Sequence, residues 1–283
     1  MSDHIHRFIF DNSDVRGAHL RLSDSYRDIL SNHHYPPAVA RLLGEFLVAA
    51  ALLSVTIKFR GSLILQVRGS GEVPLIMAEA NSNGDIRGIA RDAGEALSED
   101  FHTLLGDAQL AITIDPERGN RYQGIVRLDG DSLASCIEAY FRQSEQLATR
   151  LWLDADGEHA AGILLQELPE QHSDDATWQH LTALADTVQP EELLTLDADR
   201  LLYRLYHQEP LRIFEPKALR FQCQCSPQRV AAALVSLGQQ ELEAIIAEQG
   251  QVDSHCEFCH RQFHFSATEI AALFGEAEPH TRH

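Results

Sequence analysis

The chain has 283 residues, of which 44% are hydrophobic, enough for one large core or for two domains of unequal size. Its 23 basic and 42 acidic side chains give a net charge of −19, and its only lysines are Lys58 and Lys217. Binding to a nucleic acid or an anionic membrane requires a basic face, so this charge argues against both partners. Five cysteines are too few for a disulfide scaffold, and their odd number argues against complete pairing.

The N-terminal residues, MSDHIHR, lack the basic start and the apolar run of a signal peptide. The most apolar stretch, residues 46–57, is 12 residues long, whereas a membrane-spanning helix needs about 20. We therefore expect a buried core helix in this stretch, no membrane partner, and a soluble protein in the cytoplasm, where thiols stay reduced.

Residues 1–170 have the pattern of an α+β core domain rich in antiparallel sheet. Alternating apolar residues on both sides of a turn at residues 11–14 predict a hairpin, and apolar residues at helical spacing after Pro36-Pro37 predict a helix. Turns such as Asn83-Gly84-Asp85 separate five short strand-like runs, at residues 63–67, 74–78, 86–90, 110–114 and 124–128. Turns this short favour an antiparallel meander over βαβ winding.

Residues 171–215 are predicted to form a helical linker between this core and the C-terminal region. Twelve acidic residues and no lysine or arginine occupy positions 151–199, yet apolar side chains recur at helical spacing. One stripe contains Trp178, Leu181, Leu184, Ala185 and Val188, and a second contains Leu193, Leu194, Leu201, Leu202, Leu205 and Tyr206. The second helix begins at Pro190 and has a possible restart at Asp197. Amphipathic helices this short need a surface on which to dock.

Residues 216–283 form a small C-terminal domain with clear helix boundaries. Ser226-Pro227 suits the start of a helix that ends before Gly238, and Gly250 can end the next helix. Ser266 and Glu269 match a capping box that opens the last helix. A domain of some 68 residues is too small to rely on its hydrophobic core, so we expect a metal to stabilise it.

Four of the five cysteines lie in this domain, as Cys223-Gln-Cys225 and, after 30 intervening residues, Cys256-Glu-Phe-Cys259. Two close pairs from separate segments can give four thiolates to one tetrahedral ion, the coordination that Zn²⁺ prefers. We therefore predict that Cys223, Cys225, Cys256 and Cys259 bind one ion of zinc or of another thiophilic metal.

The residues alone leave the role of this site open. A zinc ion can simply hold the small domain together, but metal-bound thiolates can also react with oxidants. An extended Cys-x-Cys segment spans about 7 Å, near the upper limit between bridged Cα atoms. A disulfide between Cys223 and Cys225 would therefore be strained and easily reduced, which favours a reversible switch.

Other chemistries fit the cysteines less well. Residues 256–260 match the Cys-x-x-Cys-His pattern of c-type haem attachment, but there is no export signal and Cys-x-Cys would stay unexplained. A thioredoxin-like site needs a βαβ setting, whereas alternating aromatic residues here predict a hairpin. His255, His260 and His264 could compete as ligands, although we expect them beside the metal or in solvent. Cys136, within the predicted helix 133–141, is expected to be a small buried hydrophobic residue.

Motifs of several enzyme classes are missing from the sequence. It has no Gly-Lys-[Ser/Thr] phosphate loop, no complete dinucleotide-binding fingerprint, no Gly-x-Ser-x-Gly and no His-Glu-x-x-His. The 15 histidines are scattered, and no catalytic triad can be assembled from them. We therefore expect no ATP-driven action and no enzyme.

The segment FQCQCS at residues 221–226, with CEFC at residues 256–259, resembles the redox-regulated heat-shock chaperones called 33 kDa chaperonins. The resemblance covers essentially the whole chain and includes residues 81–88, 140–147, 162–166 and 192–196. Two departures are small: His260 stands where the family more often has a small or amide residue, and Phe263 where tyrosine is usual.

This resemblance implies an ATP-independent holdase that binds unfolding proteins under oxidative and heat stress. The reduced, zinc-bound form would be inactive. Activation would involve loss of zinc, the redox-active disulfides Cys223–Cys225 and Cys256–Cys259, and exposure of apolar surface by a redox-sensitive linker. The active form would be a homodimer. Alternatives are a zinc-stabilised module that binds nucleic acid or protein without redox switching, and a thiol oxidoreductase.

Overall fold

The computed structural model describes residues 3–57, 60–168 and 175–275 of the chain. Contacts divide the chain into two units, Met1–Gln222 and Cys223–His283. The three-domain division expected from the sequence, with boundaries after residues 170 and 215, stays a prediction, and its first boundary lies outside the described residues.

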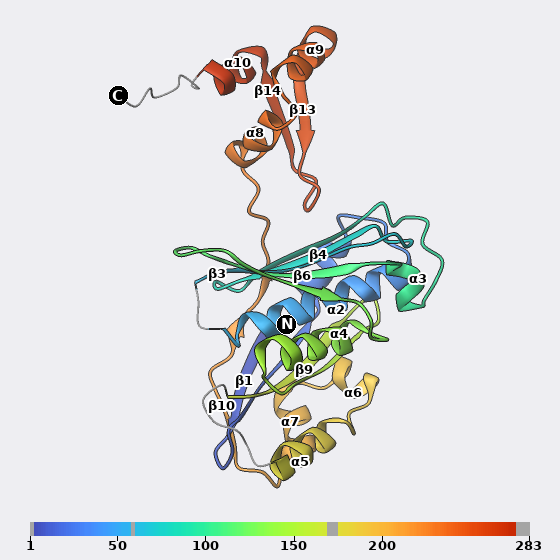
Figure 1. Cartoon of the computed structure of the whole chain (residues 1–283), viewed down its shortest axis with the longest axis vertical. Coiled ribbons are helices and arrows are strands. Elements are labelled where there is room, and N and C mark those ends of the chain that lie inside the picture. Colours follow the sequence, from blue (N-terminus) through green and yellow to red (C-terminus); the bar gives the residue numbers. More distant parts are fainter. Residues whose placement is uncertain (1–2, 58–59, 169–174, 276–283) are drawn as a thin grey trace. The chain divides into compact units, whose positions relative to one another are not determined.

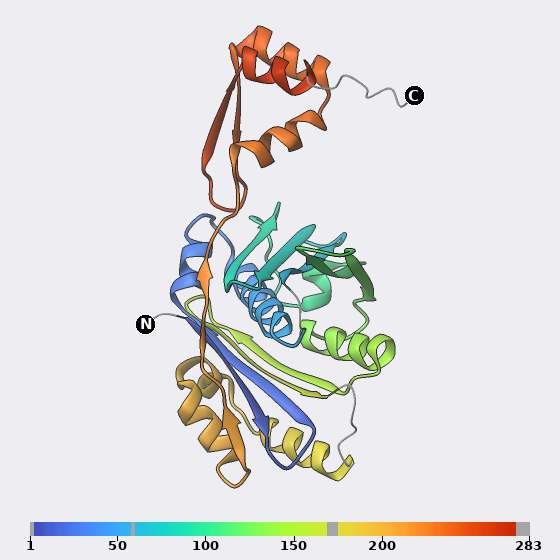
Figure 2. The ribbon, with the colours of Figure 1, turned by 90° about the vertical axis from the view of Figure 1, so that its left-hand side faces the viewer.

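Helix α2 (Pro37–Ser54) is the centre of the first unit. Proline suits its first turn because the amide there has no partner within the helix, and the helix is buried on nearly every side. One sheet packs against each side of α2 (Figures 1 and 2). By length and composition α2 could cross a membrane, but 78% of it is buried inside this unit. Most of the predicted core stretch, residues 46–57, thus lies in a buried helix, which ends at Ser54.

The first sheet has the strand order β10-β1-β2-β9-β8, with β11 also paired to β1, and every pairing is antiparallel. The predicted N-terminal hairpin is confirmed as β1 and β2. The central partner of β2 is β9, where Ala18 lies opposite Leu164. The strands are β1 (His4–Phe10), β2 (Val15–Leu22), β8 (Thr149–Ala155), β9 (Ala160–Glu167), β10 (Leu211–Ile213) and β11 (Lys217–Ala218).

The second sheet has the order β12-β5-β4-β3-β6-β7 and is antiparallel except for the short β12–β5 pairing. All five predicted strand runs are confirmed in it. Its strands are β3 (Gly61–Arg68), β4 (Leu75–Asn81), β5 (Asp85–Arg91), β6 (Gln109–Pro116), β7 (Tyr122–Arg127) and β12 (Arg220–Phe221). Further helices of this unit are α1 (Asp24–Leu30), α3 (Phe101–Leu105), α4 (Leu133–Tyr140) and the π-helical turn η1 (Phe141–Glu145).

Three helices of the predicted linker, called the linker helices below, cover the face of the first sheet that points away from α2 (Figure 2). They are α5 (Asp175–Ala185), α6 (Pro190–Thr195) and α7 (Ala198–Tyr206). The predicted restart is confirmed, because the Asp197 side chain caps α7 by accepting a hydrogen bond from the Arg200 amide at 2.9 Å. The apolar side of the linker helices is buried against a sheet face that includes Phe8, Phe10, Val15, Ile163 and Leu165.

The second unit contains α8 (Pro227–Val235), α9 (Gln239–Gln249), α10 (Ala267–Gly275) and the hairpin of β13 (Gln251–His255) with β14 (Gln262–Ser266). The predicted helix boundaries are confirmed. Gly250 ends α9 with a φ of 82°, a left-handed conformation that suits glycine, and Ser266 and Glu269 cap α10 reciprocally. The buried core is small and consists of Ala231, Leu234, Leu242, Val252, Cys256, Phe263, Phe265 and Ile270. Antiparallel sheets, separate helices and a cysteine-bearing C-terminal unit confirm the predicted α+β class.

Candidate metal centre

The first cysteine pair lies in the loop before α8. Ser226 caps this helix by accepting a hydrogen bond from the Arg229 amide at 3.3 Å, which fixes where the loop ends. The Arg229 guanidinium donates back to the Gln224 carbonyl oxygen at 3.2 Å. These contacts hold the residue between Cys223 and Cys225 against the first turn of α8.

The second pair lies in the turn of the β13–β14 hairpin. The Cys256 amide donates to the Arg261 carbonyl oxygen at 2.9 Å, and the His260 amide donates to the Cys256 carbonyl oxygen at 2.8 Å. His260 closes the turn with a φ of 53°, in the left-handed region that favours glycine and asparagine. Histidine is among the non-glycine residues that are enriched in this conformation, so His260 is compatible with the turn, although glycine would adopt it with less strain.

The four Sγ atoms of Cys223, Cys225, Cys256 and Cys259 all lie within 4.8 Å of one another. Two distances between the pairs are 3.5 Å, from Cys223 Sγ to Cys256 Sγ and from Cys225 Sγ to Cys259 Sγ. A tetrahedral zinc site with Zn–S bonds of about 2.3 Å places its sulfurs about 3.8 Å apart. The donor set and its spacing therefore fit a thiophilic ion such as zinc.

The electrostatics of the cluster also favour a cation. Burial, followed by the neighbouring thiols of Cys259 and Cys223, raises the pKa of the Cys225 thiol. Several thiolates this close repel one another, whereas a divalent cation among them favours the ionised forms. Binding of such an ion would thus release protons from the thiols.

The described histidines of this unit, His255, His260 and His264, lie outside the sulfur cluster. His264 Nδ1 contacts Asp253 Oδ1 at 2.7 Å, and the rings of His255 and His260 stack with their centroids 5.7 Å apart. Among the residues that the structure describes, the metal-capable group contains cysteines alone. The fifth cysteine, Cys136, is buried in the first unit as expected, with 1% of its surface exposed.

Comparison with known proteins identifies the family. The sequence model of the Hsp33 protein family matches residues 3–266. The chain belongs to the Hsp33 family. It is 49% identical to the 33 kDa chaperonin of Pseudomonas aeruginosa strain LESB58, with 98% of this chain and 96% of that protein covered. It is 50% identical to that of Ectopseudomonas mendocina, with both chains covered completely.

The Hsp33 fold is also found among solved structures. The crystal structure of the 33 kDa chaperonin from Thermotoga maritima matches with a TM-score of 0.82 at 20% identity, covering 96% of this chain and 98% of that one. This likeness shows the fold, and the family model with the curated relatives confirms the family resemblance seen in the sequence. The curated relatives of this chain are named chaperonins, a role that is not enzymatic.

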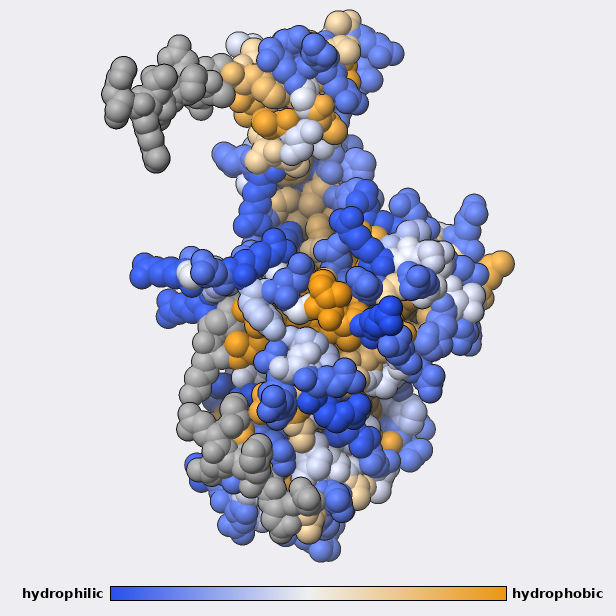
Figure 3. Space-filling model, in the orientation of Figure 1, coloured by the Kyte–Doolittle hydropathy of each residue, from blue (hydrophilic) through white to orange (hydrophobic). Residues whose placement is uncertain are grey.

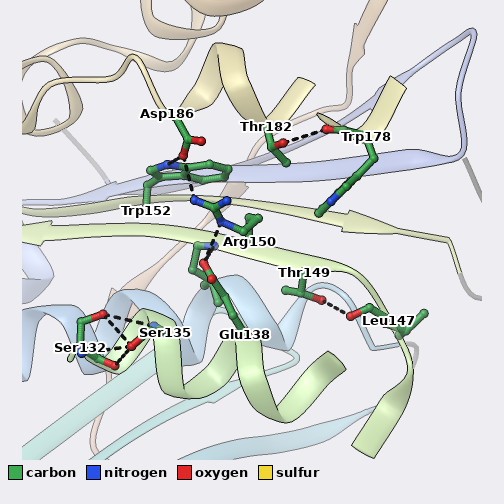
Figure 4. Close-up of polar contacts among 11 residues, drawn as sticks. Ser132, Ser135, Glu138, Leu147, Thr149, Arg150, Trp152, Trp178, Thr182 and Asp186 are labelled. Atoms are coloured by element: carbon green, nitrogen blue, oxygen red, sulfur yellow. Dashed lines mark hydrogen bonds and ion pairs between the residues drawn. The ribbon is translucent and has the colours of Figure 1, made fainter. Parts of the chain in front are cut away.

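Polar contacts that fasten the linker helices were not predicted from the sequence. Asp186, just after α5, accepts hydrogen bonds from Arg150 Nη2 at 2.8 Å and from Trp152 Nε1 at 3.0 Å (Figure 4). Arg150 Nε also lies 3.3 Å from Glu138 Oε1 of α4. At the other end, Arg21 Nη1 donates to the Thr195 carbonyl oxygen of α6 at 2.7 Å. These pairs join residues far apart in sequence, so no local pattern reveals them.

Proposed function

We propose that this member of the Hsp33 family is an ATP-independent holdase that oxidation switches on. The observation that carries the proposal is the cluster of four sulfur atoms from two separate segments in a unit with a small core. In this proposal the protein binds unfolding proteins under oxidative and heat stress and acts as a homodimer in the cytoplasm. Its net charge of −19 would help to keep an exposed apolar surface in solution and disfavours nucleic-acid and anionic-membrane partners.

In the reduced form, Cys223 and Cys225 before α8 and Cys256 and Cys259 in the hairpin turn would hold one zinc ion. Bound zinc would supply a crosslink between these two segments, with about 10–16 kcal/mol of stabilisation. A whole domain is typically stable by only about 5–15 kcal/mol. The fold of the second unit would therefore depend on its four thiolates.

Oxidation removes these thiolates. A peroxide takes two electrons from each pair of thiolates and two protons from water and is reduced to two water molecules, while one S–S bond forms per pair and the zinc ion would be released. We propose the pairs Cys223–Cys225 and Cys256–Cys259. Each closes a very short loop and constrains the chain little, so the disulfides do not replace the lost crosslink.

The linker helices provide the link from the cysteines to client binding. Their apolar side and the sheet face beneath, which includes Phe8, Ile163 and Leu165, bury each other. Asp186 and Arg21 add polar contacts at the two ends of this interface. We propose that unfolding of the second unit lets these helices leave the sheet, and that both apolar surfaces then bind unfolded proteins.

Two measurements on one sample test the proposal. Zinc content and free thiols are determined before and after peroxide treatment under mild heat, and we expect one metal ion and five thiols to become none and one, Cys136. Aggregation of a denatured client protein is followed with both samples, and only the oxidised one should suppress it. Equal suppression of client aggregation by the reduced and the oxidised protein would refute the proposed redox switch. Salt-sensitive binding of RNA by the reduced form would instead favour a zinc-stabilised nucleic-acid-binding module.

Peptide mapping of the oxidised sample tests the disulfide pairs. The 3.5 Å contacts in the cluster join Cys223 to Cys256 and Cys225 to Cys259. Peptides linked across the two segments would therefore overturn the proposed pairing within each motif, while leaving the switch itself in place.

A further inference from the structure

A cavity of about 750 Å³ lies in the first unit, between the two sheets and beside the end of α2. Its volume falls within the range of small-molecule sites, about 300–1,000 Å³. Leu63, Ile112 and Ile114 of the second sheet form an apolar wall. In the face shown in Figure 3, hydrophobic residues gather at the surface between this sheet and α4, surrounded by hydrophilic residues.

Two stretches that carry the family resemblance away from the cysteines meet at this cavity. Residues 140–147 contribute Tyr140, Phe141, Glu145 and Leu147, and residues 162–166 contribute Gln166. The first stretch contains the π-helical turn η1, a rare conformation that is frequent at functional sites. The residues that these stretches contribute to the cavity have no role in the proposed redox switch, whereas Ile163 and Leu165 of the second stretch face the linker helices on the other side of the sheet.

Arg16 gives the cavity a positive charge on its other wall. It lies on β2 directly opposite Gln166, on the side of the first sheet that faces the second sheet. Arg16 Nη2 donates to Gln166 Oε1 at 2.5 Å, whereas its buried Nε has no hydrogen-bond partner. Among the described residues no carboxylate forms an ion pair with Arg16. A cation that is partly desolvated and has only a neutral partner is unfavourable unless an anion joins it.

The only carboxylate that lines the described part of the cavity already has partners. Glu145 is exposed, and its Oε1 accepts hydrogen bonds from the hydroxyl groups of Tyr140 at 2.7 Å and Tyr122 at 3.2 Å. Gln166 is held in place in turn, because its Nε2 donates to Thr149 Oγ1 at 2.9 Å. The Arg16 guanidinium is therefore positioned, uncompensated and next to an apolar wall.

We propose that this cavity binds a single-chain amphiphile with a carboxylate head, such as a fatty acid. The carboxylate would accept hydrogen bonds from the Arg16 guanidinium, whose planar donors match its two oxygens. The hydrocarbon chain would pack against Leu63, Ile112 and Ile114. This site is independent of the four cysteines, so the proposal does not depend on the redox switch.

The test uses the full-length, reduced and metal-loaded protein with dodecanoate as the probe, below its micelle concentration, in isothermal titration calorimetry. We expect one binding site per chain and weaker binding of dodecyltrimethylammonium, which has the same chain and the opposite charge. Arg16→Gln should weaken dodecanoate binding about tenfold to a hundredfold, as expected for loss of charged hydrogen bonds. The matched control is Arg212→Gln. Arg212 is an exposed arginine of β10 that pairs with Asp11, and this variant should bind dodecanoate as the wild type does.

A second variant keeps the test decisive if Arg16→Gln folds poorly. Ile114→Trp fills the cavity from the opposite sheet and should remove dodecanoate binding without touching Arg16. Thermal melting of each variant checks that it is folded. Equal affinities of dodecanoate for wild type, Arg16→Gln and Ile114→Trp, equal binding of the cationic amphiphile, or binding only by micelles would each overturn the proposal.

Discussion

We predict that acid weakens the docking of the linker helices through His19. This residue lies on β2 beneath the start of α7, with 2% of its surface exposed. Neither ring nitrogen has a hydrogen-bond partner. Burial, with smaller contributions from His6 and Arg21, lowers the pKa of His19 from 6.5 to about 3, and Asp197 opposes this shift only weakly. The docked structure therefore holds His19 neutral over the ordinary pH range.

The size of the effect follows from proton linkage. When the linker helices leave the sheet, His19 reaches water and its pKa returns to about 6.5. The open form then binds a proton that the docked form excludes, so docking stability is complete above pH 6.5 and is lost as the pH falls toward 3. At about pH 5 the loss is about 2 kcal/mol, which raises the open population roughly thirtyfold.

Intrinsic fluorescence can follow this opening, because the two tryptophans of the chain, Trp152 and Trp178, both pack at the interface of the linker helices. Urea titrations at about pH 7.5 and about pH 5 compare wild type with His19→Leu, which cannot titrate. Glu45, whose pKa burial raises to about 7, titrates in both proteins and cancels in the comparison. Between these two pH values, we expect the free energy of linker docking to fall by about 2 kcal/mol more in the wild type than in the variant. The same pH dependence in both proteins would refute the reasoning.

Four further predictions concern single residues. Asp186→Ala removes the acceptor of Arg150 and Trp152 and should weaken linker docking by about 1 kcal/mol at this half-exposed site, seen as increased dye binding by the reduced protein. Leu201→Ala, at a fully buried residue of α7, should weaken the docking of the linker helices by about 2–5 kcal/mol, which the same dye-binding assay would show. His260→Gly relieves a left-handed backbone and should stabilise the metal-loaded second unit by about 1 kcal/mol in thermal melting. Cys136 should react with iodoacetamide only after denaturation, because burial shields its thiol and raises its pKa; labelling of the native protein would contradict this.

Much of this fold is visible in the sequence where local patterns are strong. Five strands of the second sheet, β3 to β7, were predicted one by one, since short strand-like runs are separated by turns such as the one at Gly84, whereas the short β12 was not predicted. The helix boundaries of the second unit were predicted from Ser226, Gly250 and Ser266, whose capping roles depend only on adjacent residues. The gathering of the four cysteines followed from their spacing and the preferences of zinc.

The first sheet was predicted only in part. Strand β9 is buried along almost its whole length, so it has a continuous apolar run instead of alternation and could not be told from a helix segment. Its pairing with β2 joins residues far apart in the chain. The polar contact at the cavity depends on the same pairing, because Gln166 and Arg16 meet only across it. His19 likewise has no distinctive sequence pattern, because its lowered pKa results from burial beneath the start of α7.

The placement of α2 has a consequence for how the protein is made. This helix is apolar nearly all round, and only the two sheets on either side can shield it from water. The strands β8 and β9, which complete one of these layers, are synthesised about a hundred residues after α2. In a growing polypeptide, the side of α2 that packs against the first sheet therefore stays incompletely covered until residue 167 has left the ribosome, although the second sheet can form earlier.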